Sequence, residues 1–577
     1  MAQYAPSPAP SNRLQPVART VQHPILQGNL DDLIGFINGN AALPASRRAD
    51  MVSAIRSACR ILNRLPRDVP TDPAGLNRLF ADVAPAAHGL SRGRWSNIRS
   101  LVNAAMAQAG IVVRICDSPP MLREWAVLYA LINMRSLRFR LSRLLRHLSV
   151  HGISPATVSL TDLDAFADQI LHRSLHRKPT DTWRITVGAW NKAVRTIPGW
   201  PDVEIPVTCR TNHYLLPWSA FPEPLQSSIR GWLSRLSDND VFAEISRGAV
   251  RPATLSIRNW QLRAWASAIV LKGAPASILH RPEDMLAEVN VRAAVEYLQK
   301  RKPNGKPGTM LGILLAVQSF GRHYCAAKPD DMSALQRAIA YFRKAHKKIG
   351  PGLTAKNQHR LRQFDQPEAT AALLRLPLRL RKTADTESHP RRAAVIAQLA
   401  IAVEILLMAP IRLKNLVSLE NDRHLLHPNP GRPDMLLAIP ADEVKNNVAL
   451  NFPLPQDSVE LLQWYLTKHR PQLAKPGCPY LFPGWKSTAK DTSTMRRQIV
   501  GIVARHTGLR INPHLFRSFA LKMYLEQHPG QYEVARRVLG HKSIETTTAQ
   551  YAGEEAIAAH HLYQETILAI RNKARPA

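Results

Sequence analysis

The sequence lacks the features that mark membrane and secreted proteins. No apolar run reaches the roughly 20 residues of a membrane-spanning helix, and the first residues, MAQYAPSPAPSNR, contain no apolar signal core. Cysteine is scarce and scattered, with no C-x-x-C pair, so neither a disulfide framework nor a zinc site is indicated. We therefore expect a cytoplasmic protein with reduced thiols and no membrane partner.

Motifs for nucleotide hydrolysis and metal catalysis are also missing. The chain has no GxxxxGK[ST] loop, no HExxH and no paired acidic motif of two-metal nucleases. The sequence therefore indicates no cofactor and no metal.

Acidic residues are few relative to basic ones. Lys and Arg total 77 against 43 Asp and Glu, which gives a net charge of +34. Such an excess destabilises a compact chain unless a polyanion is its usual partner. Double-stranded DNA is the first candidate.

At 577 residues and 45% hydrophobic content, the chain is long enough for several domains with real cores. Composition and periodicity divide it into six parts: a flexible N-terminal segment (1–45), a helical module (46–116), a second helical module with an extended connection (120–240), a third helical module (251–345), a linker (346–364) and a C-terminal domain (365–577). The three modules share a weak pattern that predicts either an internal repeat or unrelated three-helix units.

The second module contains a predicted helix, MRSLRFRLSRLLRH, with two unlike faces. Its leucines cluster on one side (137, 141, 144, 145 and 148), and arginines lie opposite (Arg135, Arg138, Arg143 and Arg146). This pattern suits a contact with the DNA backbone and suits a solvated surface equally well.

The stretch from Asn512 to Gly553 places imidazole, guanidinium and phenol groups at separated positions. His514 and Arg517 are three residues apart, so on a helix they share a face and can reach one anion together. Gly540 suits a helix C-cap, which predicts that the chain turns His541 back toward the first helix. A Thr-rich segment then leads to Tyr551.

These residues resemble the tyrosine site-specific recombinases, the family of phage integrases and Xer-type resolvases. Its signature is H-x-x-R, then L-G-H, then a nucleophilic Tyr, found here at His514 and Arg517, at His541, and at Tyr551. Upstream, MAPIRLKNLVSLE supplies the family's first arginine as Arg412, and a predicted hairpin supplies its lysine as Lys445. The resemblance covers residues 365 to 570 well and residues 251 to 350 more loosely.

The sequence departs from the family pattern in four places. Pro410-Ile411 replaces the usual glycine before the first arginine, and Asn415 replaces the usual acidic residue three positions after it. Ser518 follows Arg517 where His is common, and the segment from His541 to Tyr551 is one residue longer than in many relatives.

The residue types fit phosphodiester chemistry. Negative charge accumulates on the non-bridging oxygens during attack, and two fixed guanidinium groups, those of Arg412 and Arg517, suit that charge. The phenol of Tyr551 must lose its proton as it attacks, and His514 is a plausible acceptor. The resemblance assigns proton donation to the leaving oxygen to Lys445, and a hydrogen bond to the phosphate to His541. Taken singly, Arg412, His514 and Tyr551 also fit ordinary surface, helix-start and half-buried roles.

The resemblance implies mainly helical N-terminal modules, the third similar to a core-binding DNA-binding domain, followed by an α+β catalytic domain. It implies site-specific recombination or integration through a covalent 3′-phosphotyrosine intermediate, without metal, by a nucleoid-associated protein of a mobile element. The expected partners are DNA, a homotetramer on paired sites and, as an open alternative, other recombinases of the same element. Two rival functions remain: type IB topoisomerase-like relaxation and non-catalytic DNA binding.

Overall fold

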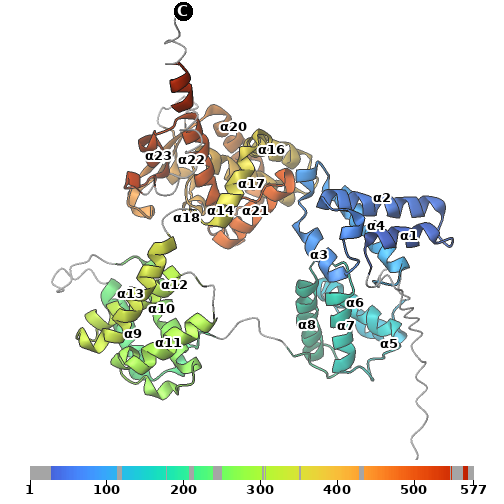
Figure 1. The fold of residues 1–577 in the computed structure, drawn as a ribbon, viewed down its shortest axis with the longest axis horizontal. Coiled ribbons are helices and arrows are strands. Elements are labelled where there is room, and N and C mark those ends of the chain that lie inside the picture. Colours follow the sequence, from blue (N-terminus) through green and yellow to red (C-terminus); the bar gives the residue numbers. More distant parts are fainter. Residues whose placement is uncertain are drawn as a thin grey trace, which may run out of the picture. The chain divides into compact units, whose positions relative to one another are not determined.

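The computed structural model describes residues 28–112, 120–176, 178–206, 214–237, 250–301, 305, 307–349, 353–427, 435–485, 487–545, 548 and 563–569. The chain forms two compact units, Met1–Val207 together with Leu353–Ala577, and Thr208–Gly352. The predicted fold class is confirmed: helical modules precede a helical domain with one small sheet (Figure 1). No helix among these residues is long and apolar enough to cross a membrane.

The first helical module has its own hydrophobic core. Its helices are α1 (Leu30–Gly39), α2 (Ala45–Leu62), α3 (Pro73–Asp82) and α4 (Arg92–Gln108). Asp72 caps α3 by accepting hydrogen bonds from the amides of Ala74 and Gly75. The helix α1 lies within the segment predicted to be flexible, whose first 27 residues are outside the described part of the chain.

The second module packs around a separate core that includes three tryptophans, Trp125, Trp190 and Trp200. It contains α5 (Arg123–Ala130), α6 (Arg135–Val150), α7 (Leu160–His172) and α8 (Pro179–Thr196) (Figure 1). The predicted leucine face of α6 is buried in this core.

The unit from Thr208 to Gly352 has a third core. Its helices are α9 (Glu223–Ser237), α10 (Pro252–Leu271), α11 (Glu288–Arg301), α12 (Pro307–His323) and α13 (Ser333–Ile349). The helix α9, which the sequence division groups with the second module, packs here through Leu225, Ile229 and Trp232.

The C-terminal domain is built around α17 (Pro390–Met408), whose alanine-rich and aliphatic sequence is buried over most of its length. The helices before the sheet are α14 (Ala355–Leu361), α15 (Pro367–Leu374), α16 (Leu376–Thr386), α18 (Leu413–Val417) and α19 (Asn421–His424). Those after it are α20 (Gln456–Trp464), α21 (Thr492–Thr507), α22 (Leu515–Gln527) and α23 (Tyr532–Leu539). This domain holds all the candidate catalytic residues.

A three-stranded antiparallel sheet, ordered β1-β2-β3, lies in the same domain. The strands are β1 (Leu425–Leu426), β2 (Met435–Ile439) and β3 (Leu450–Leu454). Ile439 pairs with Leu450, so β2 and β3 form the predicted hairpin, and Lys445 lies in its connection. The sheet therefore presents one exposed lysine on a loop held at both ends by paired strands.

Candidate active site

Arg517 is the most deeply buried charged group of the candidate site. It lies in the first turn of α22, which begins where the Asn512 side chain accepts hydrogen bonds from two main-chain amides. Arg517 is 4% exposed and donates to the carbonyl oxygens of Pro410 at 2.6 Å and Leu539 at 2.7 Å. Its guanidinium therefore joins three segments that are far apart in the sequence.

The turn after α23 brings His541 to Arg517, as the sequence predicted. Gly540 caps α23 in the left-handed conformation at φ 60°, and a Cβ there would collide with Leu450 of β3. This close approach and the positive φ both favour glycine. Arg517 Nη2 lies 3.1 Å from His541 Nε2. Because a guanidinium only donates, His541 accepts through Nε2 and carries its proton on Nδ1.

Both histidines of the site are shifted toward the neutral form. Burial, the charges of Arg517 and Arg412, and His514 lower the pKa of His541 to about 4. Partial desolvation and the same two arginines lower the pKa of the more exposed His514. His514 is therefore available as a proton acceptor at neutral pH, as its assigned role requires.

Arg412 is held more loosely than Arg517. It is the residue before α18, and its Nη2 donates to the side-chain oxygen of Asn446 at 3.2 Å. Its Nη1 is buried and has no hydrogen-bond partner among the described residues. An unpaired buried donor is costly, so this atom marks a place where an anion would be stabilised.

Asn446 is a member of the site that the sequence did not identify. Its side-chain oxygen accepts from Arg412, and its side-chain nitrogen donates to the carbonyl oxygen of Gly540 at 2.9 Å. It thereby links the first arginine to the turn that carries His541. The only sequence signal was an Asn446-Asn447 pair typical of a hairpin turn, and Asn447 does adopt a positive φ of 52°.

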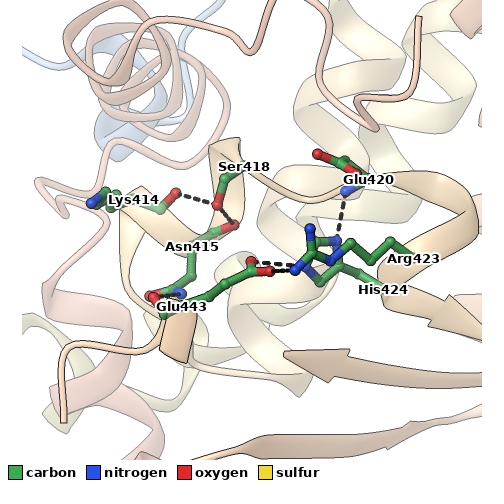
Figure 2. A network of polar contacts seen from close by, with 7 residues as sticks. All are labelled: Lys414, Asn415, Ser418, Glu420, Arg423, His424 and Glu443. Atoms are coloured by element: carbon green, nitrogen blue, oxygen red, sulfur yellow. Dashed lines mark hydrogen bonds and ion pairs between the residues drawn. The ribbon is translucent and has the colours of Figure 1, made fainter. Parts of the chain in front are cut away.

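A polar network secures the start of the loop that carries Lys445 and Asn446 (Figure 2). The carboxylate of Glu443 accepts from His424 at 3.0 Å and from Arg423 at 2.5 Å. Asn415 donates to the main-chain carbonyl of Glu443 at 3.2 Å. The residue that replaces the family's usual acid is therefore used to hold the hairpin connection.

The predicted nucleophile, Tyr551, lies outside the described residues, as do Thr546 and Thr547. Two other tyrosines of the C-terminal domain, Tyr524 and Tyr563, are alternative candidates for the nucleophile. The Tyr524 hydroxyl donates to Gln531 at 2.7 Å, and Tyr563 is 65% exposed. The described part of the chain contains no cluster of His, Cys, Asp or Glu that could hold a metal ion.

The phage integrase family model matches residues 379–556, a range that includes every candidate catalytic residue. The predicted resemblance to tyrosine recombinases is thus confirmed, and this part of the chain is a domain of the phage integrase family. No curated protein matches the chain.

Several solved structures are similar. XerA recombinase is 16% identical with a TM-score of 0.25, over 59% of this chain and 98% of that one. XerH site-specific recombinase bound to a palindromic difH substrate is 15% identical with a TM-score of 0.31, over 60% and 98%. Tn1549 transposon integrase in complex with a circular intermediate DNA is 13% identical with a TM-score of 0.37, over 59% and 99%.

Proposed function

We propose that the protein is a site-specific DNA recombinase or integrase that cuts and rejoins DNA through a covalent 3′-phosphotyrosine. The observation that carries this proposal is the buried Nη1 of Arg412, which has no hydrogen-bond partner among the described residues. It lies in a family domain where Arg517, Arg412 and His514 all lower the pKa of His541. Four nitrogen-bearing side chains from three segments of the chain make a site suited to one phosphate group.

The reaction follows from these groups. The Tyr551 oxygen attacks phosphorus, and the bond from phosphorus to the 5′ oxygen breaks, leaving a 3′-phosphotyrosine and a free 5′-hydroxyl. His514 takes the phenolic proton, and Lys445 supplies a proton to the leaving oxygen. Arg412 and Arg517 stabilise the charge on the non-bridging oxygens, and His541 donates to the phosphate through Nδ1. Attack by a 5′-hydroxyl of a partner strand reverses these steps.

The tyrosyl link conserves the energy of the phosphodiester bond, so the reaction needs neither nucleotide nor metal. We expect the active assembly to be a tetramer on two paired DNA sites, formed by this chain alone or with other recombinases of the same mobile element. Such a protein would act in the cytoplasm at the nucleoid.

A nicked DNA substrate that traps the covalent intermediate tests the proposal. The full-length protein should become linked to DNA in EDTA without nucleotide, and Tyr551→Phe should bind DNA equally well but form no link. The matched control, Tyr563→Phe, changes an exposed tyrosine and should leave linkage unchanged. Linkage by Tyr551→Phe, or a strict Mg²⁺ requirement, would overturn the mechanism. Relaxation of a plasmid without any pairing of two sites would instead favour a topoisomerase.

A further inference from the structure

Charge is segregated between two neighbouring helices of the second module. The helix α6 contains five arginines and no acidic residue: Arg135, Arg138, Arg140, Arg143 and Arg146. The helix α7 contains three aspartates and neither lysine nor arginine: Asp162, Asp164 and Asp168. Mixed charge would be enough to keep this module in solution, so a helix of one sign indicates a surface with a particular partner.

The arginines of α6 are not equivalent. Arg138 is fixed inside the module, because it donates to the carbonyl oxygens of Ile132 at 2.6 Å and Ala130 at 2.9 Å. Arg135, Arg140 and Arg146 are exposed. No carboxylate of the described residues lies within ion-pair distance of these three side chains.

Other exposed arginines of the same module do have acidic partners. Arg173 lies 3.9 Å from Asp168, Arg184 lies 3.5 Å from Asp181, and Arg195 lies 2.7 Å from Glu204. These three arginines thus have carboxylate partners, whereas Arg135, Arg140 and Arg146 have none among the described residues.

The spacing of the exposed arginines fits a DNA strand. At a rise of 1.5 Å and about 100° per residue, residues 135 and 146 are about 16 Å apart along the helix and only about 20° apart around it. Residue 140 lies between them along the axis, on the flank of the same exposed surface. Each DNA strand carries one phosphate per roughly 3.4 Å of duplex axis, so α6 can span several phosphates. Guanidinium groups bind phosphate oxygens bidentately and are a common means of backbone contact.

We propose that the exposed face of α6, defined by Arg135, Arg140 and Arg146, binds the phosphate backbone of duplex DNA at a distance in sequence from the catalytic domain. This inference rests on the proposed function in one respect, that duplex DNA is the substrate. The α6 face adds affinity and positions the substrate without reading base sequence.

Two triple variants of the full-length protein test the α6 face. The first variant replaces Arg135, Arg140 and Arg146 with Gln. The second variant replaces Arg173, Arg184 and Arg195 with Gln. Both change the net charge equally, on exposed side chains of one module, and they differ in their place in the module and in the presence of carboxylate partners. Binding of a duplex is measured from 50 to 200 mM salt.

The first variant should bind roughly tenfold or more weakly at low salt, with its log–log salt slope reduced by about 2–3, since each lost phosphate contact removes about 0.9. The second should retain the original slope. Equal slopes for the first variant and the unchanged protein would overturn the proposal.

Phe139 distinguishes DNA from a protein partner, because this ring is 78% exposed among the arginines. If α6 instead docks a second copy of the chain, Phe139→Ser should abolish association of chains, and the first arginine variant should keep the original salt slope. That pair of results would refute a DNA contact. Covalent linkage to the nicked substrate at saturating protein is measured in parallel. If the first variant shows a reduced salt slope but the unchanged protein forms no covalent link, the proposed cleavage chemistry is wrong and the DNA contact of the α6 face is still supported.

Discussion

Arg517 and Arg412 belong to the same candidate site but are held in opposite ways. Arg517 is 4% exposed and donates to two main-chain carbonyls and to His541. Arg412 makes one hydrogen bond, to Asn446, and its buried Nη1 has no partner in the described part of the chain. Arg517 therefore holds segments of the folded site together, whereas Arg412 retains a donor that can bind a ligand.

The difference has a physical cause. Carbonyl groups that are buried must be paired, so a side chain that satisfies two of them contributes to folding before any substrate arrives. A donor that stays unpaired costs stability in the free protein and recovers that cost only when an anion binds. Stability and cleavage should therefore respond differently to changes at the two arginines.

The largest effect is expected from Arg517→Ala. It leaves the carbonyls of Pro410 and Leu539 without a donor, at about 1–3 kcal/mol for each buried group. Cleavage should fall by more than about 10²–10³-fold, because a transition-state donor is also lost. Urea unfolding of the C-terminal domain and single-turnover cleavage measure the two losses. If Arg517→Ala loses cleavage but keeps the same urea unfolding midpoint, Arg517 does not contribute to the stability of the folded domain.

Arg412→Gln should lower cleavage by about 10²–10³-fold and leave the free energy of unfolding within about 1 kcal/mol. The reason is that the variant removes an unpaired buried donor along with the single bond to Asn446. The same two measurements apply. If Arg412→Gln destabilised the domain as much as Arg517→Ala does, the two arginines would not differ in their contribution to folding.

Lys445→Ala should slow cleavage by about 10²-fold, the lower end of the range for general acid catalysis. Lys445 is exposed in the hairpin connection, so stability should not change. A substrate with a 5′-bridging sulfur should restore much of the rate, since a thiolate leaves without a proton. Arg412→Gln is the matched control: its loss concerns the non-bridging oxygens and should persist with sulfur. Equal rescue of both variants would contradict the assignment of Lys445.

The smallest effect concerns pH. The pKa of His541 is lowered to about 4, so the folded state binds fewer protons than the unfolded state between that value and about 6.5. The stability contributed by the neutral ring is present above pH 6.5 and is lost as the pH falls. Between pH 7 and pH 5, the local unfolding free energy of α22 and α23 should decrease by about 1–2 kcal/mol.

Hydrogen exchange in α22 and α23, corrected for intrinsic rates, measures this pH effect. His541→Asn keeps an acceptor for Arg517 but cannot titrate, so it should remove most of the pH dependence and leave the smaller part due to His514. An unchanged pH dependence in this variant would argue against the depressed pKa of His541.

Short-range sequence patterns predicted much of the site. Gly540 followed by His541 predicted a C-cap that turns the histidine toward α22, and the structure confirms this. The sequence also predicted a hairpin that carries Lys445, and Lys445 lies in the connection between β2 and β3. Such features depend on neighbours within a few residues, where backbone conformation and helix or strand period are set.

Asn446 and the partners of Arg517 could not be predicted in this way. Asn446 reaches Gly540 across 94 residues, and Arg517 reaches Pro410 across 107. No local period distinguishes Asn446 from an ordinary turn residue. The sequence shows only that Asn415 replaces the family's usual acidic residue, whereas the structure shows that it donates to the carbonyl of Glu443 in the hairpin connection. The grouping of α9 with the third core likewise depends on contacts beyond its own helix.

The sequence by itself determined the helical modules, the order of the recombinase motif and the excess of positive charge, because these follow from residue type and spacing. Only the tertiary structure decided that Arg517 is hydrogen-bonded to carbonyl groups and that Arg412 keeps a donor with no partner in the described part of the chain. It also decided which exposed arginines of the second module have carboxylate partners. Hydrogen bonds and ion pairs form between atoms within a few ångströms, and that proximity is created by packing of segments that the chain itself keeps far apart.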